Sequence, residues 1–272
     1  MGSNGEVSKE RKLVGELLRI SRGRLELTQK QAADVLLVAE STYGSYERCE
    51  RIPPIDFLRD ADRGLDARGA IIACIEMMEE EKYPPEFVSW VRMERKALMI
   101  SAYENMLIPG LLQTQAYAQA LHEGRRPAYT EGEVERLVTA RLERQPVLRR
   151  TPSPIVGYVI EESVLERNLG GEEALREQLM HILECIRAMR QHLTVQVMPT
   201  KRHTHPGTNG SLQLMCDEEG RNLVYVEAYG GSRLIHKPEE TNALFDLFGI
   251  LRAQALTPWE SEELIERKAG DL

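Results

Sequence analysis

Two short segments near the N-terminus hold hydroxyl, amide and cationic side chains of the kind that bind DNA. Residues 28–31 read Thr-Gln-Lys-Gln, and residues 40–48 read Glu-Ser-Thr-Tyr-Gly-Ser-Tyr-Glu-Arg. Thr28, followed three residues later by Gln31, has the form of a capping box and predicts that a helix begins there. A second helix is predicted over 40–48, and it stops before Pro53 because proline disfavours helix in the preceding residue.

The apolar and small residues of these two helices predict which sides are buried. Ala32 and Ala33 provide small side chains where the helices would touch, and Tyr43 and Tyr46 are predicted to point inward. In a helix pair with a tight connection, the first helix braces against the DNA backbone and the second lies in the major groove. The second helix is then predicted to face outward with Glu40, Ser41, Thr42, Gly44 and Ser45.

Residues 27–53 resemble the Xre-type, phage-repressor-like helix-turn-helix family. Thr28-Gln29 and Ala33 match the first helix of the family pattern, and Ser41-Thr42 and Glu47 match the second. Pro53 fits the proline that follows the motif. The resemblance implies an Arg22–Glu47 pair, which we interpret as a structural, partly buried ion pair between the first and third helices.

The resemblance also implies the DNA contacts. Gln29 and the helix N-terminus would grip a phosphate, and Glu40, Ser41 and Ser45 would approach base edges. The predicted DNA-binding set is Thr28, Gln29, Lys30, Glu40, Ser41, Thr42, Gly44, Ser45, Arg48 and Arg51, of which Lys30, Arg48 and Arg51 would contact phosphates.

Two residues of the connection depart from the family pattern. Leu37 replaces the usual turn glycine, and Ala39 replaces the usual capping serine or threonine. A turn glycine takes positive φ, which leucine resists, and a lost cap costs about 1 kcal/mol. We therefore expect a distorted or longer turn, and the register of 40–45 stays open.

Composition limits the class of protein. The chain has 272 residues, 42% of them apolar, and no apolar run reaches the length of a membrane span. The N-terminus lacks the apolar core of a secretory signal, so we expect a cytoplasmic protein. Four cysteines without a C-x-x-C pair suggest neither a zinc site nor a disulfide framework.

The net charge of −8 is unevenly distributed. Residues 1–55 hold nine Lys or Arg and eight Asp or Glu, about +1, which leaves −9 for residues 56–272. The acidity therefore belongs to the larger part of the chain. The N-terminal part stays free to bind phosphate.

The periodicity predicts two domains. Residues 1–82 read as an all-α helix-turn-helix domain, and residues 79–85, with a charge run and a double proline, are the predicted linker. Residues 83–272 are predicted to form a larger α+β domain with a mostly antiparallel sheet and a final helix near 238–254. The predicted strands are 155–160, 193–198, 212–216, 223–227 and 233–236.

The C-terminal part contains the string Pro109-Gly-Leu-Leu-Gln-Thr114. With Trp90-Val-Arg-Met-Glu94 and Val195-Gln-Val-Met-Pro199, it resembles the C-terminal domain of actinobacterial antitoxin-like regulators. The resemblance implies regulation of development or specialised metabolism, and a small acidic partner protein encoded nearby. The Pro109-Gly110 pair is explained by a sharp turn into a helix, or by a loop that lines a pocket or partner groove.

Candidate catalytic residues in this part are sparse. His203 and His205 form an H-x-H pair without a third metal ligand at a suitable spacing, so a solvated basic loop is the preferred interpretation. Glu161-Glu162 could be paired carboxylates, but acids also favour a helix N-terminus. The sequence therefore predicts no enzyme, no cofactor and no metal.

These observations together predict a homodimeric transcription regulator. Its partner is double-stranded DNA, and its C-terminal domain would receive a small-molecule effector or a partner protein. Two alternatives remain open: an antitoxin-like protein whose main role is to bind a small partner, and a ligand-converting enzyme with a vestigial DNA-binding head.

Overall fold

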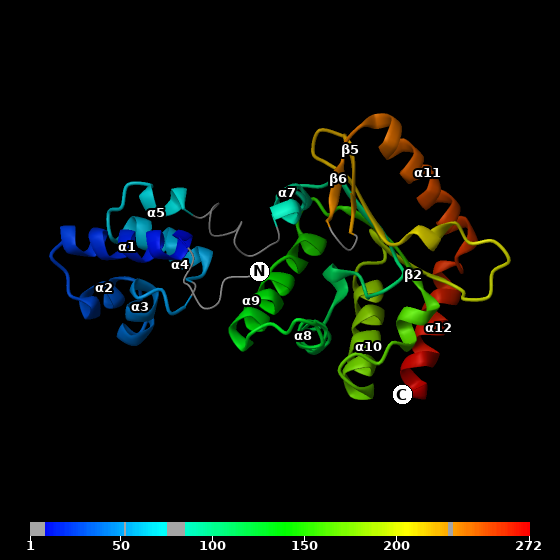
Figure 1. Cartoon of the computed structure of the whole chain (residues 1–272), viewed down its shortest axis with the longest axis horizontal. Helices are drawn as coiled ribbons and strands as arrows, with labels where there is room; N and C mark the ends of the chain where they lie inside the picture. The colour runs from blue at the N-terminus through cyan, green and yellow to red at the C-terminus, as the bar shows by residue number, and fades with distance from the viewer. Residues whose placement is uncertain (1–8, 52, 75–84, 228–230) are drawn as a thin grey trace. The chain divides into compact units, whose positions relative to one another are not determined.

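The computed structural model describes residues 9–51, 53–74, 85–227 and 231–272. The chain divides into two compact units, Met1–Pro85 and Glu86–Leu272 (Figure 1). The predicted linker at 79–85 lies, except for Pro85, outside the described residues.

The N-terminal unit is a small bundle of helices. They are α1 (Lys9–Arg24), α2 (Gln29–Val35), α3 (Glu40–Glu47), α4 (Ile55–Gly64) and α5 (Ala70–Ala73). All five helices contribute to one core, in which buried residues such as Leu18, Tyr43 and Leu58 pack together. α5 is short, and residues 75–84 of the predicted helical domain lie outside the described residues.

Four helices of this unit end in the same way. After each helix, one residue adopts positive φ. The backbone amide of the following residue then donates a hydrogen bond to the carbonyl five positions before it, as Val38 does to Ala33 at 3.0 Å. This is the Schellman motif, whose positive-φ position is usually glycine. In this chain none of the four is glycine: they are Glu26, Leu37, Cys49 and Asp66.

The C-terminal unit is built on a six-stranded sheet with the order β3-β2-β1-β4-β5-β6. β1 pairs with β2, and β2 with β3, in parallel. The β1–β4, β4–β5 and β5–β6 pairs are antiparallel, which confirms the predicted mostly antiparallel sheet. The strands are β1 (Met99–Glu104), β2 (Ile155–Glu161), β3 (Leu193–Met198), β4 (Leu212–Cys216), β5 (Asn222–Val226) and β6 (Arg233–Ile235).

Helices cover both faces of this sheet. Phe248 and Leu251 of α11 pack with Tyr103, Val159 and other residues of one face. Phe87 and Trp90 of α7 contact the ring of Tyr225 on the other face. The α-helices of this unit are α7 (Pro85–Glu94), α8 (Gln115–Glu123), α9 (Glu131–Leu142), α10 (Glu172–Ala188), α11 (Pro238–Gln254) and α12 (Pro258–Asp271).

The α+β two-domain class is confirmed, with two corrections in detail. Strand β1 was not predicted, although it lies in the middle of the sheet. The prediction that 238–254 is the final helix is wrong, because Thr257 caps a further helix, α12. No helix of the described residues is long and apolar enough to cross a membrane.

Candidate nucleic-acid interface

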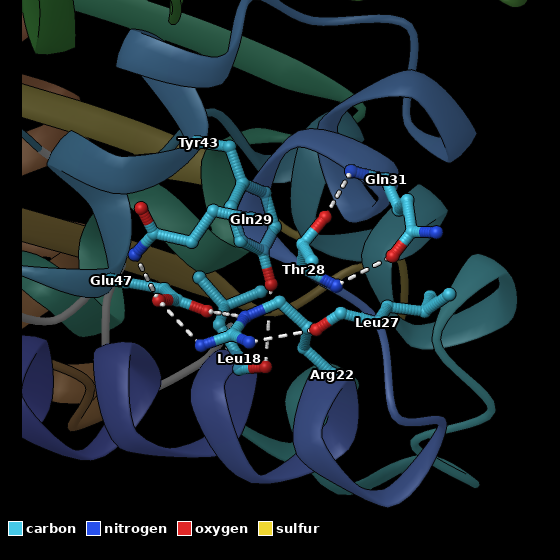
Figure 2. A network of polar contacts seen from close by, with 8 residues as sticks. All are labelled: Leu18, Arg22, Leu27, Thr28, Gln29, Gln31, Tyr43 and Glu47. Atoms are coloured by element: carbon cyan, nitrogen blue, oxygen red, sulfur yellow. Dashed lines mark hydrogen bonds and ion pairs between the residues drawn. The ribbon is translucent and has the colours of Figure 1, made fainter.

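The capping box at the start of α2 is present as predicted (Figure 2). The backbone amide of Gln31 donates to Thr28 Oγ1 at 3.2 Å, and the backbone amide of Thr28 donates to Gln31 Oε1 at 2.8 Å. The bonds fix the entry of the chain into α2. Thr28 and Lys30 are exposed beside this helix N-terminus.

Glu47 at the end of α3 is the centre of a polar network that joins three helices (Figure 2). Arg22 of α1 donates to its two carboxylate oxygens at 2.6 and 3.2 Å. Gln29 of α2 donates to Glu47 Oε2 at 2.6 Å, and Arg22 also donates to the Leu27 carbonyl. Burial opposes ionisation of Glu47, but the hydrogen bonds from Arg22 and Gln29 outweigh it and lower the pKa of this carboxyl. The pair that the resemblance implies thus fixes α3 against α1 and α2.

The tyrosines of α3 point into the bundle. Tyr43 and Tyr46 are buried, and their rings lie 6.4 and 4.7 Å from the ring of Phe57 on α4. The Tyr43 hydroxyl donates to the Leu18 carbonyl of α1, and burial raises the pKa of this phenol. With the tyrosines buried, the first turn of α3 faces solvent: Glu40 and Ser41 are exposed, and Thr42 is half-buried.

The prediction that Gly44 and Ser45 face outward is wrong. Ser45 is 7% exposed, and its hydroxyl donates to the Thr42 carbonyl at 2.7 Å. A Cβ at Gly44 would lie 2.8 Å from Arg48 Nη1 and 3.3 Å from Gln29 Oε1, so these side chains cover that position. The open polar surface of α3 is therefore shorter than predicted and consists of its first turn.

The cationic residues of the predicted set differ in their partners. Arg48 is exposed but forms a bidentate pair with Glu50, at 2.8 and 2.9 Å. Arg51 and Lys30 are exposed, and the structure gives neither side chain an ion pair with a described residue. Gln29, which we predicted to grip phosphate, has its amide nitrogen engaged by Glu47.

The expected distortion of the turn between α2 and α3 is absent. Leu37 takes the glycine conformation, with φ of 55°, and the Schellman bonds of the turn are intact. Its side chain is 94% exposed, so it avoids the bundle. Ala39 does stand at the cap of α3 without a side-chain hydrogen bond. Cys49, which follows α3, is a further non-glycine residue with positive φ, at 62°.

Comparison with protein families assigns both units. Residues 13–72 match a helix-turn-helix domain, and residues 87–267 match a domain of unknown function, DUF5753. The chain belongs to the DUF5753 family. Its N-terminal unit is a helix-turn-helix domain, which points to a DNA-binding regulator. No curated protein and no solved structure matches the chain.

In the DUF5753 domain, the Pro109-Gly110 string lines a small cavity of about 20 Å³. Burial and the neighbouring Glu227 raise the pKa of Glu104, another lining residue, to about 8. A Cβ on Gly110 would overlap the guanidinium of Arg141, so a larger residue there would displace this side chain. Both interpretations that the sequence left open fit the structure. Pro109 precedes a 3₁₀ helix over Gly110–Leu112, and the same string lines the cavity.

The same domain brings together an acid–base group that the sequence did not reveal. Glu161 Oε1 accepts hydrogen bonds from Tyr103 Oη and His205 Nε2, each at 2.8 Å. His205 Nδ1 accepts from the Gly207 amide at 3.0 Å, so both ring nitrogens are occupied. The expected solvated loop is therefore wrong for His205, which anchors the loop to the sheet. In the sequence, His205 lies 44 positions from Glu161 and Tyr103 lies 58 positions from it, so no local pattern connects the three residues.

Metal ligands do not gather around the histidine pair. His203 is exposed, and His205 is engaged by Glu161 and Gly207. Within the described ranges, no group of three or more His, Cys, Asp or Glu is placed to hold a metal ion. Glu162 stands in the first turn of a 3₁₀ helix, where an acid is favourable.

Proposed function

We propose that this DUF5753 protein is a sequence-specific DNA-binding transcription regulator that acts in the cytoplasm and is controlled through its C-terminal domain. The observation that carries the proposal is the orientation of α3. Its tyrosines are buried on Phe57, while Glu40 and Ser41 at its N-terminus are exposed. A recognition helix reads base edges with its N-terminal residues.

The proposed contacts follow from exposure and free hydrogen-bonding capacity. Glu40, Ser41 and Thr42 would read bases, and Thr28, Lys30 and Arg51 would position the domain on phosphates. Gln29 would act through the helix N-terminus and through its bond to Glu47. Arg48 would reach a phosphate only by leaving Glu50. Gly44 and Ser45 would serve as the packed base of this surface.

A homodimer would place two such helices in successive major grooves, about 34 Å apart. Control would follow if an effector or partner protein bound the C-terminal domain differently in the DNA-competent and incompetent arrangements. Target genes of development or specialised metabolism are the expectation carried by the resemblance to antitoxin-like regulators.

The proposal is tested by gel shift of the full chain on DNA selected from genomic fragments. Lys30→Ala removes one phosphate contact, so binding should weaken on all sequences, and the salt slope should fall by about 1. Arg176→Ala is the control, because Arg176 is an exposed cation on α10. Equal loss in both variants, or no selected DNA at all, would contradict the proposal. Retention of a co-purifying partner without DNA binding would favour the antitoxin-like alternative.

A further inference from the structure

A groove of about 620 Å³ lies between α8 and α9 of the DUF5753 domain. The two helices are in contact in the C-terminal unit (Figure 1). A volume of this size is within the range of small-molecule sites, roughly 300–1,000 Å³. Ten residues line it, whereas a stable protein interface takes roughly 20–30 residues a side. The groove therefore suits a small molecule better than a protein partner.

The inner wall of the groove is apolar. Val134 and Val138 of α9 pack with Ala118 of α8, and Tyr129 and Leu142 complete this small cluster. Four of these five residues line the groove. Val134, Val138 and Leu142 recur at helical spacing, so they form one stripe along α9. An occupant with an apolar body would gain from contact with this stripe.

The remaining lining is acidic. Glu123, Glu131 and Glu135 line the groove, and no Lys, Arg or His is among the described lining residues. All three side chains are exposed, and the structure gives none of them an ion pair with a described residue. The Glu123 carboxylate accepts a hydrogen bond from Gln119, and the Glu123 backbone carbonyl accepts one from Arg126. Three unneutralised carboxylates beside an apolar stripe favour a cation over a neutral or anionic molecule.

Tyr129 closes one end of the groove. The guanidinium of Arg125 lies 4.7 Å from the centroid of the Tyr129 ring, outside the lining residues. Arg125 also donates to the Tyr129 hydroxyl, so this ring face is already occupied by a cation. An amine would therefore be recognised by the three carboxylates and not by the Tyr129 ring.

We propose that this groove binds a small organic cation, an amine with an apolar body. The inference deepens the proposed function, because it names the chemical class of effector that the C-terminal domain would take. It also separates this site from any acidic partner protein, which the three glutamates would repel.

The test uses the full chain and 4-phenylbutylamine as the probe, with 4-phenylbutanol and 4-phenylbutanoate as neutral and anionic matches. Methyl NMR should show shifts at Val134 and Val138 for the amine, with weaker binding of the alcohol and none of the carboxylate. Glu131→Gln with Glu135→Gln should weaken amine binding about fivefold, as expected for two exposed ion pairs, and leave alcohol binding unchanged.

Glu172→Gln with Glu173→Gln is the matched control, since both acids are exposed in the first turn of α10. It should leave amine binding unchanged. Equal binding of the three probes, equal loss in both double variants, or no shift with millimolar amine would overturn the inference. Gel shifts of the same variants report on DNA binding separately, so a failed groove and a failed DNA-binding proposal remain distinguishable.

Discussion

Glu47 holds α1, α2 and α3 together through a single carboxylate. Its side chain is nearly buried, and its partner Arg22 is partly exposed, at 4% and 19%. A buried ion pair adds little stability by itself, because both charges lose water. Removing one partner is costly, because the other charge stays behind without compensation. The pair therefore acts mainly to fix the orientation of the proposed recognition helix.

Glu47→Gln should destabilise the N-terminal unit by about 3 kcal/mol, because Arg22 then lies partly buried without its counter-charge. Hydrogen exchange of the α3 amides in the full chain measures this locally. Glu50→Gln removes the exposed partner of Arg48 and should change the exchange far less, because an exposed ion pair adds little stability. Similar effects of the two substitutions would contradict the role given to Glu47.

The raised pKa of Glu104 predicts how the stability of the C-terminal unit depends on pH. Burial raises the pKa of Glu104 to about 8, above its unfolded value near 4.5, so the folded unit retains a proton that the unfolded chain loses. Its stability contribution is complete below about pH 4.5 and is lost as pH rises towards 8. Unfolding followed by the fluorescence of Trp90 and Trp259 should therefore show falling stability over this window.

Glu104→Gln keeps a neutral hydrogen-bonding side chain at this position and should flatten that pH profile. The variant should gain stability relative to the unsubstituted chain at pH 8 and little at pH 5. An unchanged slope in the variant would show that another group is responsible.

Among the elements, the helices of the DNA-binding unit were predicted better than their ends. Tyr43, Tyr46 and the Thr28 capping box follow from spacing, because burial and capping leave local patterns. The burial of Ser45 depends on how α2 and α3 pack, and this packing cannot be predicted from a local sequence pattern. Strand β1 was missed for a similar reason: its place at the centre of the sheet comes from partners far along the chain.

The helix ends show where local preference gives way to tertiary structure. Leu37 keeps positive φ although leucine pays about 1 kcal/mol or more for it. The turn is held in place by the hydrogen bond from the Val38 amide to the Ala33 carbonyl and by the partly buried Val38 side chain. A glycine rule applied to the sequence therefore predicts a distortion that packing prevents.

Leu37→Gly should stabilise the N-terminal unit by about 1 kcal/mol, since glycine adopts this conformation without steric cost. The exchange of α2 and α3 amides measures the gain. Val35→Gly, at the last residue of α2, is the control and should destabilise by about 1 kcal/mol. A loss of stability in Leu37→Gly would mean that the leucine side chain makes a contact of its own.

At the scale of the whole molecule, the two parts of the chain differ in charge. The first 55 residues are about neutral, whereas the remaining residues carry −9. An acidic body disfavours non-specific DNA contact, so binding would depend on the few cations of the N-terminal unit. The proposed amine groove lies in the acidic unit and would not compete with DNA for the same charges.

The most direct test of the central claim is in vitro selection of DNA by the full chain, compared with a variant that combines Ser41→Ala and Thr42→Ala. We predict that the unsubstituted chain enriches a sequence with two half-sites about one helical turn apart, and that the variant loses preference at defined base pairs while it still binds DNA. An identical enriched sequence for both proteins would contradict the assignment of the first turn of α3 as the surface that reads DNA.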